Sequence, residues 1–407
     1  MATSRSDKMP VWPLIATLAI QTLATMALFS LPAAAPVVVR DLGVDSGLVG
    51  LFVSLVYGVG IVSAVLSPGF IHRYGAVRVS QAALVGAALM LLVTAIGTLA
   101  SIGLGALLLG IGYGANAPAA THLLVPQTPR RVFNLVMSVR QIGVPLGGIL
   151  GALIVPPLVV AVGWPEAMAV QAVPILLLIV ALQFYRGRWD SGRDPARRVW
   201  GGALPQLLRL LREDAAIRRL SVACFVYTGV QVAFIAFMTV HLTSEAGFDL
   251  IAAGRALAAY QIAGAIARPV WGWAADRFMS SSGILALCGL VMAAMALATG
   301  WFGPGWPVWL ILLVCVVAGF TASGYTGVAY AEYADLGGAR RTEATGLGTA
   351  TMFLGAMLIP STMGFILTAT GNYTLCFGLM AALAGLAGML LAVAPRHAAS
   401  PAPAPEI

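Results

Sequence analysis

The chain has 407 residues, 60% of them hydrophobic and only 9% charged, and its mean hydropathy is +0.93. A soluble domain carries about 25% charged residues, so this composition excludes an ordinary soluble protein and predicts a chain that lies mainly in a lipid bilayer. The formal net charge of +8 is concentrated in short segments between apolar runs, which argues against a nucleic-acid partner and for a membrane topology.

Apolar runs of membrane-spanning length follow one another along the chain. The first begins near Val11, is too long for the core of a signal peptide and shows no convincing cleavage site, so we expect it to be a membrane helix. A spanning helix needs about 20 mostly apolar residues. Runs of this kind lie near 11–38, 48–70, 79–98, 100–124, 135–160, 164–185, 219–243, 252–274, 282–302, 306–330, 344–368 and 373–394. The sequence therefore predicts an all-α membrane protein of about twelve transmembrane helices.

The interruption after the sixth run divides the chain. Residues 1–185 are predicted to form one six-helix half and residues 219–396 a second, with an arginine-rich linker at 186–218 and a disordered, proline- and alanine-rich tail at 397–407. Within the linker, Leu207–Leu211 is expected to form a short helix on the membrane surface.

The distribution of basic residues predicts the orientation. Loops on the cytoplasmic side of a bacterial membrane protein carry an excess of Lys and Arg. Only Arg40 and Arg255 fall on one side, and the other basic residues between spans fall on the opposite side with both termini and the linker. We therefore expect a multi-pass protein of the cell inner membrane with both termini in the cytoplasm.

Two segments one half-length apart form an internal repeat. Ala267–Phe278 ends the predicted eighth helix at a turn, and Ser67–Gly75 ends the second helix in the same way. His72 aligns with Asp276, and Arg73 aligns with Arg277. Two halves in the same orientation, joined by a cytoplasmic linker, are typical of one large class of transporters.

These features resemble the major facilitator superfamily, whose members carry a Gly-x-x-x-Asp-Arg-x-Gly loop after helix 2 and a copy after helix 8. Met279 replaces the final glycine of the second copy, and Pro68 and His72 replace the first glycine and the aspartate of the first copy. In that family the loop latches the cytoplasmic side. The resemblance makes five matching residues candidates for a gating loop: Arg73, Gly75, Gly272, Asp276 and Arg277. At His72 we expect an uncharged turn, with protonation-sensitive gating as the alternative.

The predicted fifth helix contains a proline and several glycines in Ser138–Gly148. This run is similar to one in prokaryotic carriers of the cyanate-permease-like kind. The run does not match the Gly-Pro-x-x-Gly-Gly signature of drug/proton antiporters, because only one residue separates Pro145 from Gly147. Small residues allow close helix packing, and proline permits bending, as an interface that rocks requires. The alternative is that these glycines serve helix packing alone.

Two arginines are predicted to lie deep in the membrane. Arg268 precedes Asp276 by eight residues, which places it about 12 Å from the cytoplasmic turn. Half of the hydrocarbon core is about 15 Å, so Arg268 lies near the midplane. Arg140 follows Arg131 by nine residues and reaches a comparable depth. A charge at this depth costs several kcal/mol unless it faces a wet cavity or a partner.

No acidic residue is expected at the depth of these arginines. A substrate anion would complete the site, since guanidinium groups match carboxylates. Ala267-Arg268-Pro269 with Gly272 is similar to the eighth-helix pattern of monocarboxylate and oxalate carriers, in which the arginine binds the substrate carboxylate. The first-helix signature of the monocarboxylate family is absent, so that family is not assigned. The alternative is that each arginine binds helix carbonyls or a network at the cytoplasmic end.

Polar and aromatic residues on other predicted helices are candidates to line the same cavity. Such residues are rare in lipid-facing positions, although each could instead form a packing hydrogen bond. The candidates for substrate binding, besides Arg140 and Arg268, are Gln141, Tyr57, Tyr113, Asn116, Tyr227, Gln231, Gln261 and Tyr325.

The sequence predicts a secondary active transporter of a small organic anion, a carboxylate above all, that works by alternating access. Symport with protons is one form of coupling that fits this prediction, and exchange of one anion for another is the alternative. The alternative is an efflux transporter for hydrophobic compounds or drugs, although pumps for cations usually need a membrane-embedded acid. An enzyme is not expected, because the chain lacks HExxH and GxSxG motifs. We expect no cofactor and no metal, a monomer, and the lipid bilayer as the surroundings.

Overall fold

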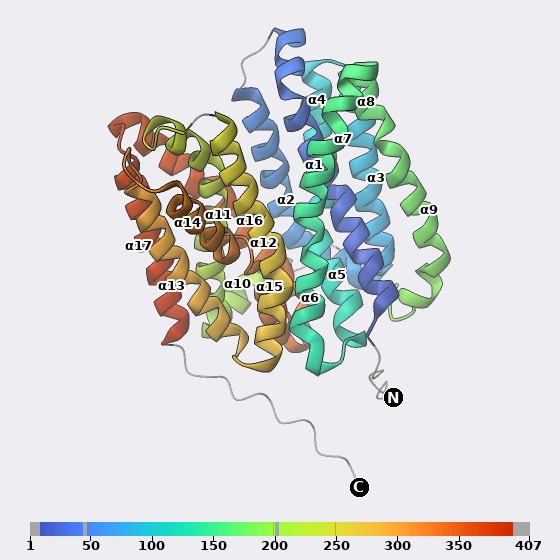
Figure 1. Ribbon diagram of the computed structural model, residues 1–407. Coiled ribbons are helices and arrows are strands. Elements are labelled where there is room, and N and C mark those ends of the chain that lie inside the picture. Colours follow the sequence, from blue (N-terminus) through green and yellow to red (C-terminus); the bar gives the residue numbers. More distant parts are fainter. Residues whose placement is uncertain (1–8, 44–46, 198, 200–202, 249, 394–407) are drawn as a thin grey trace.

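The computed structural model describes residues 9–43, 47–197, 199, 203–248 and 250–393. The predicted tail and the basic residues Arg5 and Lys8 lie outside these residues. The described chain is built from helices and contains no strand. Figure 1 shows them as one bundle of long, roughly parallel helices.

The first half consists of eleven helical segments. In chain order they are α1 (Val11–Leu42), α2 (Gly47–Tyr74), α3 (Ala76–Thr94), α4 (Leu99–Tyr113), α5 (Asn116–Leu124), η1 (Val125–Gln127), η2 (Arg130–Val132), α6 (Phe133–Gln141), α7 (Gly143–Val162), α8 (Trp164–Val170) and α9 (Ala172–Trp189).

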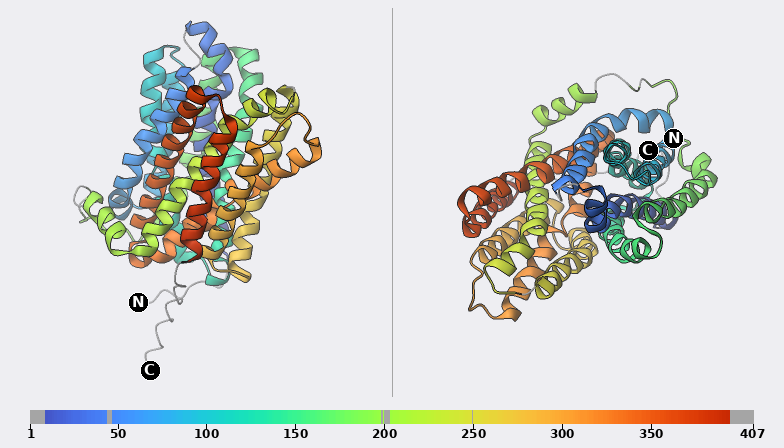
Figure 2. Two further views of the ribbon diagram at one scale, coloured as in Figure 1. Left: turned by 90° about the vertical axis from the view of Figure 1, so that its left-hand side faces the viewer. Right: turned by 90° about the horizontal axis from the view of Figure 1, so that it is seen from above.

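The linker contains α10 (Ala203–Glu213), and the second half follows it. The elements of the second half are α11 (Ala215–Ser244), α12 (Leu250–Arg277), α13 (Ser281–Gly300), α14 (Val308–Ala322), α15 (Thr326–Gly337), η3 (Gly338–Arg340), α16 (Arg341–Thr370) and α17 (Tyr373–Ala392). The short helix α10 contains the helix expected in the linker, and it lies at the edge of the bundle in Figure 2.

Ten segments of the described chain are long and apolar enough to cross a membrane. One of them, Val308–Leu367, contains both α14–α15 and α16, which run as two passes. Helix α12 is not among the ten, and it carries Arg255, Arg268 and Asp276 along its length. Adding the extra pass and α12 to the ten gives twelve, as the sequence predicts.

Several passes are broken into two helices. The fourth pass is α4 and α5, the fifth is α6 and α7, and the tenth is α14 and α15. The break between α4 and α5 lies at Gly114, and that between α14 and α15 contains Gly324. These two breaks occupy matching positions in the two halves. Breaks of this kind release backbone carbonyl groups inside the protein, where they need hydrogen-bond donors.

One hydrophobic core lies within the first half, and a second core fills the second half and also includes first-half residues such as Leu124 and Phe133. Glycines lie at the closest helix contacts. A Cβ atom added at Gly114 would lie 2.0 Å from the carbonyl oxygen of Gly60 on α2. A Cβ atom added at Gly319 on α14 would lie 2.0 Å from the carbonyl oxygen of Tyr260 on α12. Only glycine allows these helix pairs to pack at this distance.

Helix α1 begins and α17 ends at the same end of the bundle, which we call the terminal end (the lower end in Figure 1). The two halves touch one another there through α2 with α16, and through α6 with α12 and α15. Gly327 on α15 shows how close this contact is, because an added Cβ would lie 2.2 Å from the Cα atom of Ser138 on α6.

Candidate substrate site between the halves

A cavity of about 560 Å³ lies between the two halves. The contacts of α2 with α16, and of α6 with α12 and α15, separate this cavity from the terminal end. On α1 its wall runs from Gln21 to Ala33, and on α7 it runs from Val144 to Ala152, so it extends from mid-depth away from the terminal end. Helices α11, α12, α15 and α16 complete the wall from the second half.

Arg140 lies in this cavity wall at the last turn of α6, and only 2% of its surface is exposed. Its Nη2 donates to Oε1 of Gln21 at 2.8 Å, and its Nη1 donates to the side-chain oxygen of Gln141. Its Nε is buried and has no hydrogen-bond partner. The partners of Arg140 are therefore neutral amides, which hold the guanidinium in place and leave its charge uncompensated.

Arg268 lies opposite, on α12, and is also 2% exposed. Its Nε donates to the carbonyl oxygen of Ser323 at 3.1 Å, and its Nη1 donates to the carbonyl oxygen of Gln141. Both carbonyl groups lie at helix breaks, where no amide of the same helix is available to them. The alternative expected from the sequence, that the arginine binds helix carbonyls, describes these two contacts of Arg268.

Neither guanidinium has a carboxylate partner among the described residues, where ion pairs involve only residues outside the cavity wall. Two like charges that are buried in one cavity repel each other. Gln141 connects them, because its side chain accepts from Arg140 and its carbonyl accepts from Arg268. A buried pair of like charges is unfavourable unless an anion joins it.

An aromatic group forms another part of the wall. Tyr57 and Phe353 meet edge to face with ring centroids 5.0 Å apart, and Tyr113 stacks on Phe353 at 5.8 Å. The hydroxyl of Tyr113 lies 3.2 Å from Oγ1 of Thr25, which accepts from Gln21. The aromatic group is thus connected to Arg140 through a chain of hydrogen bonds.

The structure brings together most of the residues that the sequence suggests for substrate binding. The cavity wall contains Arg140, Arg268, Gln141, Tyr57, Tyr113, Asn116, Gln231 and Gln261. Tyr227 and Tyr325 lie behind the wall. The hydroxyl of Tyr227 donates to the carbonyl oxygen of Leu285 at 3.0 Å, and that of Tyr325 lies 2.6 Å from Oγ1 of Thr228, which lines the cavity.

Sequence reasoning missed other residues of the wall, including Phe353, Ser323, Thr326 and Tyr330. A signal for Thr326 was present in the internal repeat. When Gly114 is aligned with Gly324, Thr326 takes the position of Asn116. Phe353 had no such signal, because one phenylalanine among many on apolar helices is not distinctive.

At the terminal end, Asp276 binds the beginning of α6 in the other half. Its Oδ1 accepts from the backbone N–H of Asn134 at 3.0 Å and from that residue's side-chain amide at 2.9 Å. Its Oδ2 accepts from the N–H of Leu135 at 2.9 Å. A carboxylate at a helix N-terminus binds unpaired N–H groups and the positive end of the helix dipole.

His72, which aligns with Asp276, has a different partner. Its Nε2 lies 3.2 Å from Oε1 of Glu343 in the first turn of α16. Arg197 of the linker reaches the same oxygen at 3.6 Å. Where the sequence predicts an uncharged turn, the structure therefore has a polar contact between the halves.

Of the remaining gating-loop candidates, Arg73 and Gly75 lie just before α3, and Gly272 and Arg277 lie on α12. Gly75 has a φ of +96°, and Arg73 donates to the carbonyl oxygen of Arg197 at 3.2 Å. The N–H groups of Val77 and Arg78 donate to the carboxylate of Asp190 at 2.9 and 3.1 Å. Burial raises the pKa of the Asp190 carboxyl, against the lowering by these hydrogen bonds. Gly272 packs against Ser138, and Arg277 is exposed.

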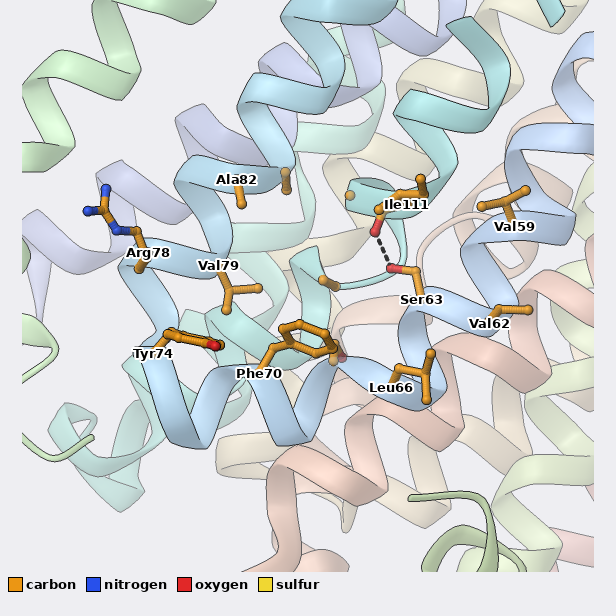
Figure 3. A pocket seen from close by; sticks show the side chains of 14 residues that line it. Val59, Val62, Ser63, Leu66, Phe70, Tyr74, Arg78, Val79, Ala82 and Ile111 are labelled. Carbon is orange, nitrogen blue, oxygen red and sulfur yellow. Dashed lines mark hydrogen bonds between the residues drawn. The ribbon is translucent and has the colours of Figure 1, made fainter. Parts of the chain in front are cut away.

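A second cavity, of about 350 Å³, lies on the outer side of the first half between α2, α3 and α4 (Figure 3). Its wall is mainly apolar, with Arg78 and Tyr74 at one end and Val59 and Val62 at the other. The hydroxyl of Ser63 closes one side by donating to the carbonyl oxygen of Ile111. This cavity contains no residue of the second half, so it cannot be the site between the halves.

Comparisons with known proteins place the chain in a family. The model of the Major Facilitator Superfamily matches residues 17–336 and 220–407. The 4-hydroxybenzoate transporter PcaK of Pseudomonas aeruginosa is 27% identical over 275 residues, which cover 60% of this chain and 61% of PcaK. The probable nitrate/nitrite transporter NarK2 of Mycobacterium tuberculosis is 27% identical over 387 residues, which cover 89% of this chain and 90% of NarK2.

Solved structures share the fold. The human organic anion transporter MFSD10 superposes with a TM-score of 0.76 at 18% identity, covering 94% of this chain and 100% of that one. The fucose:proton symporter FucP of E. coli gives a TM-score of 0.73 at 16% identity and covers 95% of this chain and 99% of that one. The fold, the paired six-helix halves and the family match together establish that this chain is a multi-pass membrane protein of the Major Facilitator Superfamily.

Proposed function

We propose that the protein carries a small organic anion, a carboxylate above all, across the inner membrane by alternating access. The observation that carries this proposal is the pair of buried guanidinium groups, Arg140 and Arg268, which share one cavity and have no carboxylate partner among the described residues. A carboxylate between them would accept hydrogen bonds from both and relieve their repulsion.

The residues of the cavity wall favour an organic substrate over a small inorganic ion. Tyr57, Tyr113 and Phe353 form an aromatic surface, and much of the remaining wall is aliphatic. Aromatic faces bind flat apolar groups by stacking. The matched relatives are named as carriers of anions, one organic and one inorganic, which supports an anionic substrate. The chain spans only about 61% of the length of PcaK, so its substrate is not carried over.

The proposed orientation puts the closed end of the transporter on the cytoplasmic side. With the terminal end in the cytoplasm, the contacts at Asp276 and His72 close the cytoplasmic side, and the cavity extends toward the outside. Opening of these contacts would expose Arg140 and Arg268 to the cytoplasm. The described cavity wall contains no Asp, Glu or His, so in symport the proton would travel on the substrate or outside this wall.

Uptake into proteoliposomes tests the proposal. The purified protein would be offered labelled benzoate, 4-hydroxybenzoate, an aliphatic monocarboxylate and nitrate, each with and without a pH gradient. We expect uptake of at least one carboxylate, and Arg268→Gln and Arg140→Gln should each reduce it by at least about tenfold, because a charge-assisted hydrogen bond is lost.

Arg78→Gln is the matched control, since Arg78 lies outside the cavity between the halves. Folding of each variant would be checked by its elution from a sizing column. Unchanged uptake of every transported anion by both cavity variants would show that the arginines do not bind the substrate.

A further inference from the structure

Two residues in matching positions open the second helix of a broken pass. Asn116 is the first residue of α5 and lies two residues after Gly114. Thr326 is the first residue of α15 and lies two residues after Gly324. Helices α5 and α15 belong to different halves and pack against each other. The fold therefore presents one polar side chain from each half at the same level of the cavity.

Both side chains line the cavity and both lack partners. Asn116 is 4% exposed and Thr326 is 9% exposed. No hydrogen bond is made by Oδ1 or Nδ2 of Asn116, or by Oγ1 of Thr326. Among the described residues with a buried, unpartnered side-chain atom, only Asn116, Arg140 and Thr326 belong to the cavity wall.

Buried polar groups in folded proteins are almost always hydrogen-bonded, and an unpaired one is costly. The cost is accepted at sites where a ligand supplies the partner. Four of the buried, unpartnered atoms of the described residues belong to the cavity wall, on Asn116, Arg140 and Thr326, where a polar group of a bound ligand could supply their partner.

The chemistry of the unpaired atoms identifies that group. Asn116 offers both a donor, Nδ2, and an acceptor, Oδ1, and the Thr326 hydroxyl can act as either. A carboxylate only accepts, so it would leave Oδ1 of Asn116 without a partner. A hydroxyl both donates and accepts. The donor Nε of Arg140 and the cation Arg268 suit the carboxylate instead.

We propose that Asn116 and Thr326 form a second polar subsite, which binds a hydroxyl group of the substrate while Arg140 and Arg268 bind its carboxylate. This inference rests on the proposed function and makes it narrower: the substrate is a hydroxycarboxylate. Because each subsite takes one residue from each half, both ends of the substrate bridge the halves.

The test compares anions that differ by one hydroxyl. Binding of benzoate and of its 2-, 3- and 4-hydroxy isomers, and of propionate and lactate, would be measured by isothermal titration with the purified full-length chain. We expect at least one hydroxy compound to bind about tenfold or more tightly than its parent, because a site with unpaired polar groups rejects the analogue that lacks the hydroxyl.

Two variants in different halves, Asn116→Leu and Thr326→Val, remove the hydrogen-bonding groups with little change of shape. Each should reduce the hydroxy-to-parent affinity ratio toward one and leave binding of the parent within about threefold. The control is Thr121→Val, which makes the same change at a fully buried, unpartnered threonine of α5 outside the cavity wall. It should keep the wild-type ratio.

The ratio is measured within each variant, so a lower yield of folded protein does not affect it. No preference for any hydroxy compound in the wild type would overturn the subsite, as would a ratio that survives both substitutions. If Arg268→Gln still abolishes anion binding in that case, the proposed function stands without the subsite. If the arginine variant binds anions as well as the wild type, the proposed function itself fails.

Discussion

The imidazole Nε2 of His72 on α2 lies 3.2 Å from Oε1 of Glu343, the third residue of α16. In the internal repeat, Asp276 corresponds to His72. Leu135 corresponds to Glu343, since each is the third residue of its helix, α6 and α16. In the second copy the acid lies on the long helix and binds the N–H groups of α6. In the first copy the carboxylate is that of Glu343, which lies in the first turn of α16 itself and faces His72 on the long helix α2. The carboxylate has therefore moved to the opposite side of the contact.

The reversed contact makes a counter-intuitive prediction for His72→Asp. This change restores the residue typical of the family, yet it would set two carboxylates against each other in a contact whose side chains are 18% and 9% exposed. We expect the closed terminal end to lose about 1–3 kcal/mol relative to the open one. Adding Glu343→Gln should restore closure, because the new carboxylate could then accept from the amide and from the start of α16.

Spin labels on exposed residues of η2 and η3, which directly precede α6 and α16, would report the distance across the terminal end. The four native cysteines are buried, which favours selective labelling. A distance distribution that His72→Asp leaves unchanged would contradict the predicted repulsion.

A second prediction concerns the contact between Gly327 and Ser138. A Cβ added at Gly327 would lie 2.2 Å from the Ser138 Cα atom, so Gly327→Ala should force α15 and α6 apart. The two atoms belong to different halves, and we expect the terminal end to open while each half stays folded. The control is Gly254→Ala on α12, where an added Cβ meets nothing within 4 Å. Equal label distances in the two variants would show that this contact does not limit closure.

The turn before α3 gives a third prediction. Gly75 has a φ of +96°, and an added Cβ would lie 2.2 Å from Cγ of Asp190. Gly371 also has a positive φ, +64°, but an added Cβ would meet nothing. Gly371→Ala should therefore cost about 1–2 kcal/mol from backbone strain alone. Gly75→Ala should cost clearly more, since it also displaces the carboxylate that caps α3. Thermal unfolding in detergent compares the two, and a similar loss in both would exclude a role for the Asp190 contact.

A fourth prediction tests how Arg140 is positioned. Gln21→Leu removes the oxygen that accepts from its Nη2 and leaves another N–H group unpaired. The guanidinium should become less ordered, and we expect the KM for the transported anion to rise about tenfold. Gln81→Leu is the matched control, because Gln81 is equally buried but binds Ile179 and Gln183 away from the cavity. A similar KM in both variants would argue against positioning by Gln21.

Hydropathy and the spacing of arginines were enough to predict the helical passes and the fold. They could do so because a bilayer restricts a chain to long apolar helices. The depths of Arg140 and Arg268 followed from the helical rise, and the structure places both in one cavity. Their partners could not be predicted, because the carbonyl groups of Gln141 and Ser323 become available only where helices break.

The helix breaks and the contacts made by the linker depend on tertiary structure. Nothing in the local sequence around Asp190 indicates that its carboxylate caps α3, more than 100 residues earlier, as the hydrogen bonds to Val77 and Arg78 show. The partner of His72 was equally hidden, since Glu343 follows it by 271 residues. Pairings of this kind require the three-dimensional packing of both halves.

The contacts of Asp190 and Asp194 have a practical consequence for dividing the chain. Asp190 caps α3, and the N–H of Asp194 donates to the carbonyl oxygen of His72 at 2.9 Å. A fragment cut at the end of the sixth pass would lack both contacts, although it would contain every membrane helix of its half. Expression of the halves as separate polypeptides should therefore place the cut beyond Arg197, so that this part of the linker stays with the first half.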